Sequence, residues 1–272
     1  MSISRAKITV PSLAGYKAEH HPLTMVTAYD STFASIVDSA GIDIILVGDS
    51  VGTVMQGHKT TLGVTMEQME YHVSMVASAK PKALIVGDLP FGSYQSSPQD
   101  AVRNAVRLIK AGAEVIKLEG GLFVREAIEA IVRADIPVMG HIGLTPQSYH
   151  RMGGNKVQGR NEGTQVGGKN RVLSDARAVE EAGVCSFVIE AVPAELAAEI
   201  TSLSDVPTIG IGAGVDCDGQ VLVLHDLLGL SEKSLTFAKT YNNLREQSIS
   251  AVSAYIAEVH ARSFPDSTHS FQ

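Results

Sequence analysis

The sequence predicts a (β/α)8 barrel, in which eight parallel strands close into a barrel surrounded by helices. Short apolar runs rich in β-branched residues alternate with longer amphipathic stretches, the order expected of a parallel sheet with helical crossovers. Each strand–helix unit is roughly thirty residues long, so the 272 residues have room for about eight units. A doubly wound open sheet has the same alternation and remains the rival architecture.

Eight segments are predicted to be strands, and the eighth has the weakest pattern. In chain order they are Leu23–Tyr29, Ile42–Val47, Ala83–Val86, Val115–Leu118, Pro137–His141, Ser186–Ile189, Thr208–Ile211 and Val221–Leu224. In a parallel barrel their carboxyl ends lie at one face, where the reactive groups of such enzymes gather.

The helix after the third strand has the clearest start and stop signals. Ser97 can cap it, Pro98 suits its first position, and Gly112 ends it. Gly183 ends the helix predicted at Asp175–Ala182 in the same way.

We expect one domain over residues 1–272, because no linker or low-complexity segment divides the chain. The Gly-rich stretch Arg151–Arg171 is either a mobile loop beside an active site or a surface excursion. The tail, Leu235–Arg262, predicts a long C-terminal helix, which either caps the barrel or lies in a subunit contact.

Charge and cysteine content exclude several classes of protein. With 29 acidic and 22 basic residues the net charge is −7, which argues against a nucleic-acid-binding protein. Cys185 and Cys217 stand apart from any metal-binding spacing, which fits a reducing cytoplasm. The first residues lack the apolar run of a signal peptide, and the longest apolar runs are too short to cross a bilayer.

Polar side chains follow most of the predicted strands. In strand order they are Asp49 and Ser50, Asp88, Lys117 and Glu119, His141, and Glu190. Carboxylates from successive strand ends form the oxygen-rich environment that Mg²⁺ prefers. The sequence after Asp49, residues 50–57, predicts a loop rather than a helix that Asp49 would cap. For Asp88 the alternative is an Asx-turn before Pro90.

The remaining polar positions also have structural alternatives. Alternation places Lys117 and Glu119 on one face, where they are either functional or a structural ion pair. Glu190 is a candidate general base or a partner of the next helix dipole. His141 is nearly as well explained as a buried, hydrogen-bonded core residue.

Weaker signals lie elsewhere in the chain. Tyr94 and Gln95 are candidate substrate contacts or turn residues. The Gly-rich run at 209–214 lacks the Lys-Ser/Thr of a P-loop and is at most an anion-binding turn.

Nine motifs between residues 49 and 226 resemble the ketopantoate hydroxymethyltransferase family, and the resemblance covers the chain from about residue 5 to residue 262. They are Asp-Ser-Val-Gly-Thr at 49–53, Gly-His-Lys-Thr-Thr-Leu-Gly-Val-Thr at 57–65, Gly-Asp-Leu-Pro-Phe at 87–91, Ser-Tyr-Gln at 93–95, Lys-Leu-Glu-Gly-Gly at 117–121, Gly-His-Ile-Gly-Leu-Thr-Pro-Gln at 140–147, Lys-Val-Gln-Gly-Arg at 156–160, Ile-Gly-Ile-Gly-Ala-Gly at 209–214 and Asp-Gly-Gln-Val-Leu-Val-Leu-His-Asp at 218–226.

The resemblance implies a TIM barrel of the phosphoenolpyruvate/pyruvate type with an additional C-terminal helix, assembled as a homodecamer. It implies transfer of a one-carbon unit from 5,10-methylenetetrahydrofolate to 3-methyl-2-oxobutanoate, which gives 2-dehydropantoate for pantothenate and coenzyme A synthesis.

The resemblance also implies roles for particular residues. Asp49 and Asp88 would bind Mg²⁺ and contact the substrate, and Glu119 would complete the metal site directly or through water. Ser50 and Lys117 would hold the substrate carboxylate, and Glu190 would accept its proton. The segment at 161–170 is longer than the family pattern leads us to expect.

Two rival functions remain at this point. One is a Mg²⁺-dependent lyase or mutase of the same barrel group, which also chelates a 2-oxo acid. The other is a catalytically silent barrel that serves as a scaffold or anion-binding module, which would not need carboxylates gathered at the strand ends.

Overall fold

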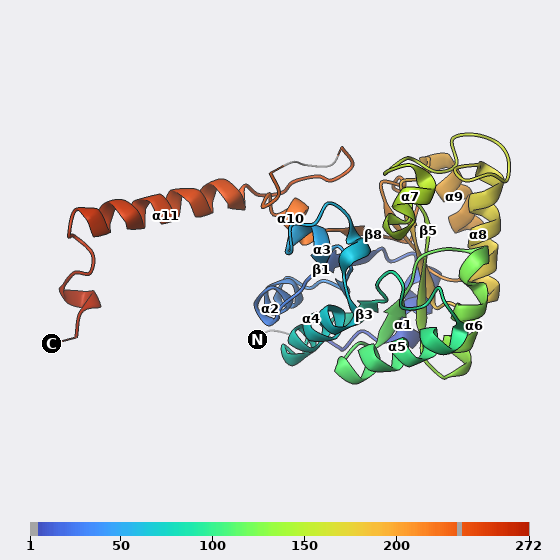
Figure 1. The fold of residues 1–272 in the computed structure, drawn as a ribbon, viewed down its shortest axis with the longest axis horizontal. Coiled ribbons are helices and arrows are strands. Elements are labelled where there is room, and N and C mark those ends of the chain that lie inside the picture. Colours follow the sequence, from blue (N-terminus) through green and yellow to red (C-terminus); the bar gives the residue numbers. More distant parts are fainter. Residues whose placement is uncertain (1–4, 233–235, 272) are drawn as a thin grey trace. The chain divides into compact units, whose positions relative to one another are not determined.

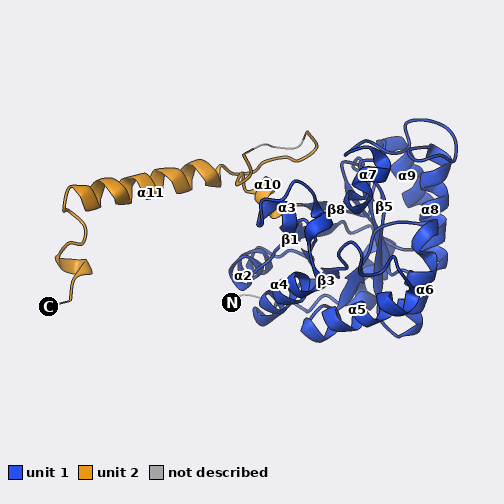
Figure 2. Ribbon diagram, viewed as in Figure 1, with its two compact units in different colours: residues 1–222 blue, residues 223–272 orange. Residues whose placement is uncertain are grey.

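The computed structural model describes residues 5–232 and 236–271 of the chain. It divides into two compact units, residues 1–222 and residues 223–272, coloured separately in Figure 2. The first unit carries all the strands of the described residues.

The eight strands of the first unit form a closed parallel barrel in sequence order (Figure 1). They are β1 (Leu23–Thr27), β2 (Ile44–Val47), β3 (Leu84–Asp88), β4 (Val115–Lys117), β5 (Val138–Gly143), β6 (Ser186–Glu190), β7 (Thr208–Ile211) and β8 (Gly219–Leu222). The predicted barrel is therefore confirmed and the open sheet is excluded. The weakest predicted strand closes it, because β8 pairs with both β7 and β1.

Helices connect the strands. They are α1 (Val10–Ala18), α2 (Ser31–Ser39), α3 (Val51–Val54), α4 (Met66–Ser78), α5 (Pro98–Ala111), α6 (Arg125–Arg133), α7 (Tyr149–Met152), α8 (Lys169–Glu181) and α9 (Ala194–Leu203), with short 3₁₀ turns η1 (Thr61–Gly63), η2 (Leu122–Val124) and η3 (Pro146–Ser148). The predicted caps of α5 are present: the Ser97 hydroxyl accepts a 3.1 Å hydrogen bond from the Asp100 amide, and Gly112 has φ +115°.

Two local expectations were wrong. Residues 50–57 do not form only a loop, since α3 begins directly after Ser50. Buried Val51 and Gly52 anchor this single turn against the barrel, a packing effect that outweighs the loop-like composition. The helix expected from Asp175 begins earlier, at Lys169, so it takes up the end of the predicted loop 151–171.

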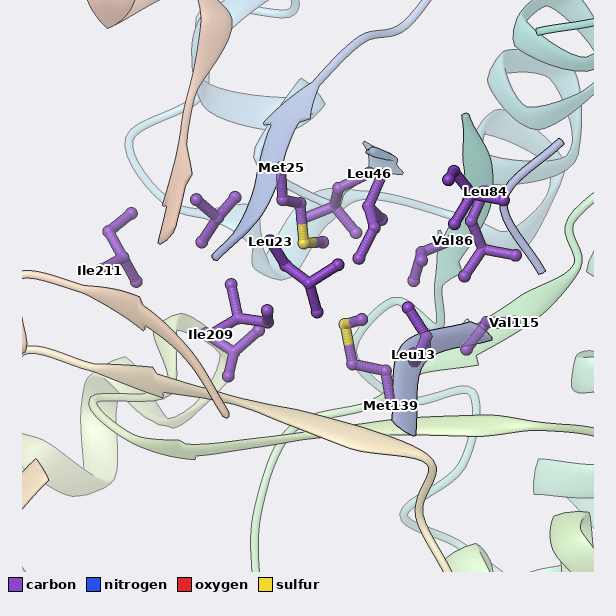
Figure 3. Close-up of a cluster of buried hydrophobic side chains, with 14 residues drawn as sticks. Leu13, Leu23, Met25, Leu46, Leu84, Val86, Val115, Met139, Ile209 and Ile211 are labelled. Carbon is purple, nitrogen blue, oxygen red and sulfur yellow. The ribbon is translucent and has the colours of Figure 1, made fainter. Parts of the chain in front are cut away.

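The barrel interior is filled by one set of alternating residues from the strands (Figure 3). Leu23 and Met25 of β1 and Leu84 and Val86 of β3 illustrate the two-residue period that directs side chains to one face. Leu13 of α1 belongs to the same cluster and is 1% exposed. This apolar cluster provides a rigid base for the polar groups that follow on the same strands.

The second unit contains α10 (Leu224–Leu227), α11 (Leu244–His260) and η4 (Ser267–His269). The predicted C-terminal helix is present as α11, but residues 236–243 are not helical, and the helix begins at Leu244, after Asn243 caps its first turn. Its expected start at Leu235 lies outside the described residues. The apolar positions Ile249, Val252, Ile256 and Val259 of α11 are all exposed. Within the described residues, no helix is long and apolar enough to cross a membrane.

Candidate active site and metal centre

Polar groups form the uppermost inward-facing layer of the barrel. Asp88 follows Leu84 and Val86 in the inward row of β3, and Lys117 follows Val115 in β4. His141 and Glu190 continue the corresponding rows of β5 and β6. The alternation that fills the core with apolar side chains therefore brings these four side chains to its carboxyl end.

Three buried carboxylates lie together at this end of the barrel. Asp49, from the β2–α3 turn, Asp88, and Glu119, from the segment after β4, each offer an oxygen within 4.8 Å of the others. They are 4%, 1% and 5% exposed, respectively. The backbone amide of Asp49 also donates a hydrogen bond of 3.3 Å to Asp88. The predicted metal residues are thus brought together, and we call them the carboxylate cluster.

Lys117 is paired with Asp88. Its Nζ lies 2.9 Å from both Asp88 carboxylate oxygens, and both side chains are almost fully buried. Burial alone would lower the pKa of Lys117, but the charges of Asp88 and Glu119 raise it, so the ammonium form persists. The sequence left open an ion pair between Lys117 and Glu119. In the structure the carboxylate that is hydrogen-bonded to Lys117 is that of Asp88 instead.

The carboxylate cluster holds more negative charge than Lys117 offsets. Burial, followed by repulsion from Asp88 and Glu119, raises the pKa of Asp49 well above its usual value. Burial raises the pKa of Asp88 despite the opposing charge of Lys117. Burial would raise the pKa of Glu119 too, but His141 and Lys117 lower it overall. Such a cluster is stabilised by an added cation.

His141 lies between the carboxylate cluster and Glu190. Its Nε2 is 3.1 Å from Glu190 Oε2, and its Nδ1 is 3.6 Å from Glu119 Oε1. Neither ring nitrogen has hydrogen-bond geometry to a described residue, so both contacts are mainly electrostatic. Burial and Lys117 would lower the pKa of His141, but the two glutamates raise it to about 9. His141 is buried, as the alternative of a core histidine requires, but the groups it contacts are carboxylates of the site.

Gln147 was not among the predicted site residues, although it ends the motif at 140–147. Its Nε2 donates to Asp49 Oδ2 and to the Leu89 carbonyl oxygen, each at 3.0 Å. Its backbone amide donates a 2.9 Å hydrogen bond to Glu119 Oε2. It therefore connects two members of the carboxylate cluster. A glutamine within a short 3₁₀ turn, here η3, carries no sequence signal for this role.

Tyr94 and Gln95 complete this network. The Tyr94 hydroxyl lies 2.6 Å from Gln147 Oε1 and 3.0 Å from the carbonyl oxygen of Glu119. Gln95 Nε2 donates to Gln147 Oε1 at 3.1 Å. The sequence interpreted both residues as substrate contacts or turn residues. In the structure both side chains contact Gln147, so they support the site from within the protein.

The other candidates lie further out. Ser50 follows Asp49, is half-buried, and has its hydroxyl 2.8 Å from the Tyr29 hydroxyl. The Gly-rich run at 209–214 spans the end of β7 and the turn toward β8. Neither contributes a ligand atom to the carboxylate cluster.

The donor set fits a hard divalent cation. The cluster offers carboxylate oxygens, which suit Mg²⁺, and includes neither imidazole nor thiolate. The amide of Gln147 and the ring of His141 support the carboxylates from outside, as hydrogen-bonded groups commonly do around metal ligands.

Comparison with known proteins identifies the family of the chain. The family model described as ketopantoate hydroxymethyltransferase matches residues 7–267. The chain belongs to the ketopantoate hydroxymethyltransferase family. The 3-methyl-2-oxobutanoate hydroxymethyltransferase of Pelobacter propionicus is 53% identical over 273 residues, covering all of both chains. That of Geobacter metallireducens is 54% identical over 267 residues, which cover 97% of this chain and 98% of the relative. The recognition from sequence motifs is confirmed.

Solved structures with the same fold come from other enzymes. Phosphonopyruvate hydrolase in complex with oxalate and Mg²⁺ has a TM-score of 0.62 at 13% identity, covering 96% of this chain and 92% of the other. Phosphoenolpyruvate phosphomutase from Streptomyces platensis subsp. rosaceus has a TM-score of 0.62 at 16% identity, covering 94% and 88%. At these identities they share only the barrel type with this family member.

Proposed function

We propose that this family member transfers a hydroxymethyl unit to 3-methyl-2-oxobutanoate in pantothenate biosynthesis, with 5,10-methylenetetrahydrofolate as donor. The observation that carries the proposal is the carboxylate cluster with Lys117 at the carboxyl end of the barrel. Relatives named for this activity are about half identical to this chain over nearly its full length, which supports the assignment of the substrate.

Asp49, Asp88 and Glu119 would hold Mg²⁺. Bound there, Mg²⁺ would supply Lewis-acid chemistry for the carbonyl of a 2-oxo acid. Asp49 and Asp88 would thereby also contact the substrate.

Ser50 and Lys117 would orient the substrate carboxylate. Lys117 offers a buried ammonium group whose only hydrogen-bonded carboxylate in the described residues is Asp88. With Mg²⁺ offsetting the negative charge of the carboxylate cluster, this ammonium group would have the capacity to bind the substrate carboxylate as well. The Ser50 hydroxyl, at the start of α3, adds a neutral donor.

Glu190 would take the proton from C3 of the substrate. Its side chain is 15% exposed, more than the carboxylates of the cluster, so substrate can approach it. His141 contacts its carboxylate and would hold it in the barrel mouth. Proton removal leaves an enolate whose charge Lys117 offsets. The enolate carbon then bonds to the donor methylene; overall, both methylene–nitrogen bonds of the folate break, one water molecule supplies the hydroxyl oxygen, and the two freed nitrogens take up the C3 proton and one water proton.

We also propose that the chain forms a homo-oligomer, a homodecamer by the family resemblance. The row of exposed apolar residues on α11 supports a contact with another chain. Light scattering with in-line size exclusion measures the assembly; a monomer would contradict it.

An assay for 2-dehydropantoate formation tests the proposed function. We expect product only with 3-methyl-2-oxobutanoate and methylenetetrahydrofolate together, and loss of product when EDTA removes Mg²⁺. Product from a 2-oxo acid in the absence of folate would instead support a lyase or mutase.

A further inference from the structure

A pocket lies beside the carboxylate cluster and shares residues with it. Its empty volume is about 640 Å³, part of it open to solvent. Glu119 and Gln147 line it from the cluster side, and Phe123, Arg151 and Arg171 line it from η2, α7 and α8. We call it the Phe123 pocket.

One aromatic ring holds two cations in this pocket. The guanidinium carbons of Arg171 and Arg151 lie 4.3 Å and 5.5 Å from the centroid of the Phe123 ring. Phe123 is 74% exposed, so its ring is not explained by burial in a core. Cation–π attraction keeps both guanidinium groups at the pocket wall.

Both arginines retain hydrogen-bond donors for a ligand. Arg171 uses Nε to bind Asp175 at 2.8 Å, and within the described ranges its two terminal nitrogens donate no hydrogen bond. Asp175 also accepts from the Leu122 amide at 2.9 Å. Arg151 donates only to the Ser148 hydroxyl, at 3.3 Å, and no carboxylate of residues 5–232 or 236–271 pairs with it.

The charge of the pocket rim therefore favours an anion. Asp175 offsets one of the two guanidinium charges. Glu119, at the inner end, is already surrounded by Lys117 and His141. Exposed Phe91 also lines the pocket and adds apolar surface. The pocket is thus suited to an aromatic ligand that carries carboxylates.

The one-carbon donor of the proposed function has such a part. It is an aminobenzoyl ring joined to glutamate, which bears two carboxylates. We infer that the Phe123 pocket binds the aminobenzoyl-glutamate part of the donor, with Arg151 and Arg171 pairing with its carboxylates. The inference rests on the proposed function. It places the carboxylates of the donor at the pocket rim and leaves the inner end, where Glu119 lies, for the part of the donor nearer the methylene.

Steady-state kinetics test this arrangement. Arg151→Gln and Arg171→Gln should each raise KM for the donor about tenfold or more, the loss expected for a charge-assisted hydrogen bond. Arg177→Gln removes an exposed charge from the same helix as Arg171, outside the pocket, and should leave KM unchanged. An unchanged donor KM in both pocket variants overturns the inference.

Calorimetry with a fragment tests binding without turnover. Wild-type protein should bind p-aminobenzoylglutamate about tenfold more tightly than the diamide that lacks both carboxylates. Arg151→Gln and Arg171→Gln should lose that preference, while Arg177→Gln retains it, with thermal unfolding confirming that each variant folds. No binding of the diacid, or equal affinity for diacid and diamide, overturns the inference. A wild type without transferase activity and without C3 proton exchange of the keto acid contradicts the proposed function instead.

Discussion

Gln147 Nε2 donates a hydrogen bond of 3.0 Å to Asp49 Oδ2, and the Gln147 backbone amide binds Glu119 at 2.9 Å. A residue that follows β5 thereby fixes carboxylates that follow β2 and β4. Without such donors, three buried carboxylates repel one another and lose a common geometry. Gln147 is therefore a positioning residue for the carboxylate cluster.

Gln147→Leu should weaken Mg²⁺ binding by roughly 10–100-fold, the usual effect of losing a partner that orients a metal ligand. Titration calorimetry on the folded variant measures this affinity. Gln158 is a matched control, because it is also buried and its Nε2 bonds to the Lys156 carbonyl oxygen instead of the cluster. Equal Mg²⁺ affinity in Gln147→Leu and Gln158→Leu would contradict the assignment.

Glu190→Gln should retain Mg²⁺ and substrate binding but slow C3 proton exchange of 3-methyl-2-oxobutanoate in D₂O by about 10²–10⁴-fold. This is the typical contribution of a protein base. Proton NMR without folate isolates this step. Exposed Glu195, in the first turn of α9, supplies the control Glu195→Gln. Exchange at the wild-type rate in Glu190→Gln would remove Glu190 from the mechanism.

Asp49→Asn and Asp88→Asn should both weaken Mg²⁺ binding but change stability in opposite directions. The raised pKa of Asp49 means that its charge opposes folding at neutral pH, so the neutral amide should stabilise the metal-free protein. Burial raises the pKa of Asp88 as well, but Asp88→Asn also leaves the buried Lys117 without its hydrogen-bonded carboxylate, and this loss of roughly 3–5 kcal/mol outweighs the relief from the Asp88 charge. Urea unfolding in EDTA measures both. Destabilisation by Asp49→Asn would contradict the unfavourable charge of Asp49, and unchanged stability in Asp88→Asn would show that Lys117 does not depend on Asp88.

His141 should make the stability of the metal-free protein pH-dependent. Its pKa is raised from 6.5 to about 9, so the folded state binds this proton more tightly than the unfolded chain does. The resulting stabilisation is complete below about pH 6.5 and is lost as the pH rises through about 9, an effect on the order of 3 kcal/mol. The difference in unfolding free energy between wild type and His141→Gln in EDTA should shrink over this range. If the unfolding free energies of wild type and His141→Gln change in parallel with pH, the charged state of His141 is disproved.

Strand periodicity predicted much of the site from the sequence. The same two-residue alternation that marks Leu84 and Val86 as core places Asp88 at the top of the barrel, and the same holds for Met139 and His141. These predictions depend only on local geometry, which the sequence specifies.

Contacts that depend on strand register could not be predicted. Lys117 pairs with Asp88 because β3 and β4 align these two residues directly. Alternation within β4 instead suggested Glu119 as the partner. Gln147 escaped prediction for a related reason: its contacts join three separate strand ends, and only the closed barrel brings those ends together.

Gly143→Ala should disturb Glu190 more than its size suggests. Gly143 has φ +86°, and a Cβ there would lie 2.3 Å from the Glu190 carbonyl oxygen and 2.7 Å from the Val192 side chain. That carbonyl oxygen accepts a 2.8 Å hydrogen bond from the Leu144 amide, so relief of the clash must move the end of β6.

Gly41→Ala is the control, because φ there is +94° and nothing lies within 4 Å of the added carbon. Gly41→Ala should cost only the backbone strain, about 1 kcal/mol, and leave C3 exchange intact. Gly143→Ala should cost more in unfolding free energy and slow exchange about tenfold or more, since small displacements of a reacting group are costly. Exchange rates that match between the two variants would show that the position of Glu190 does not depend on the close approach of β5 and β6.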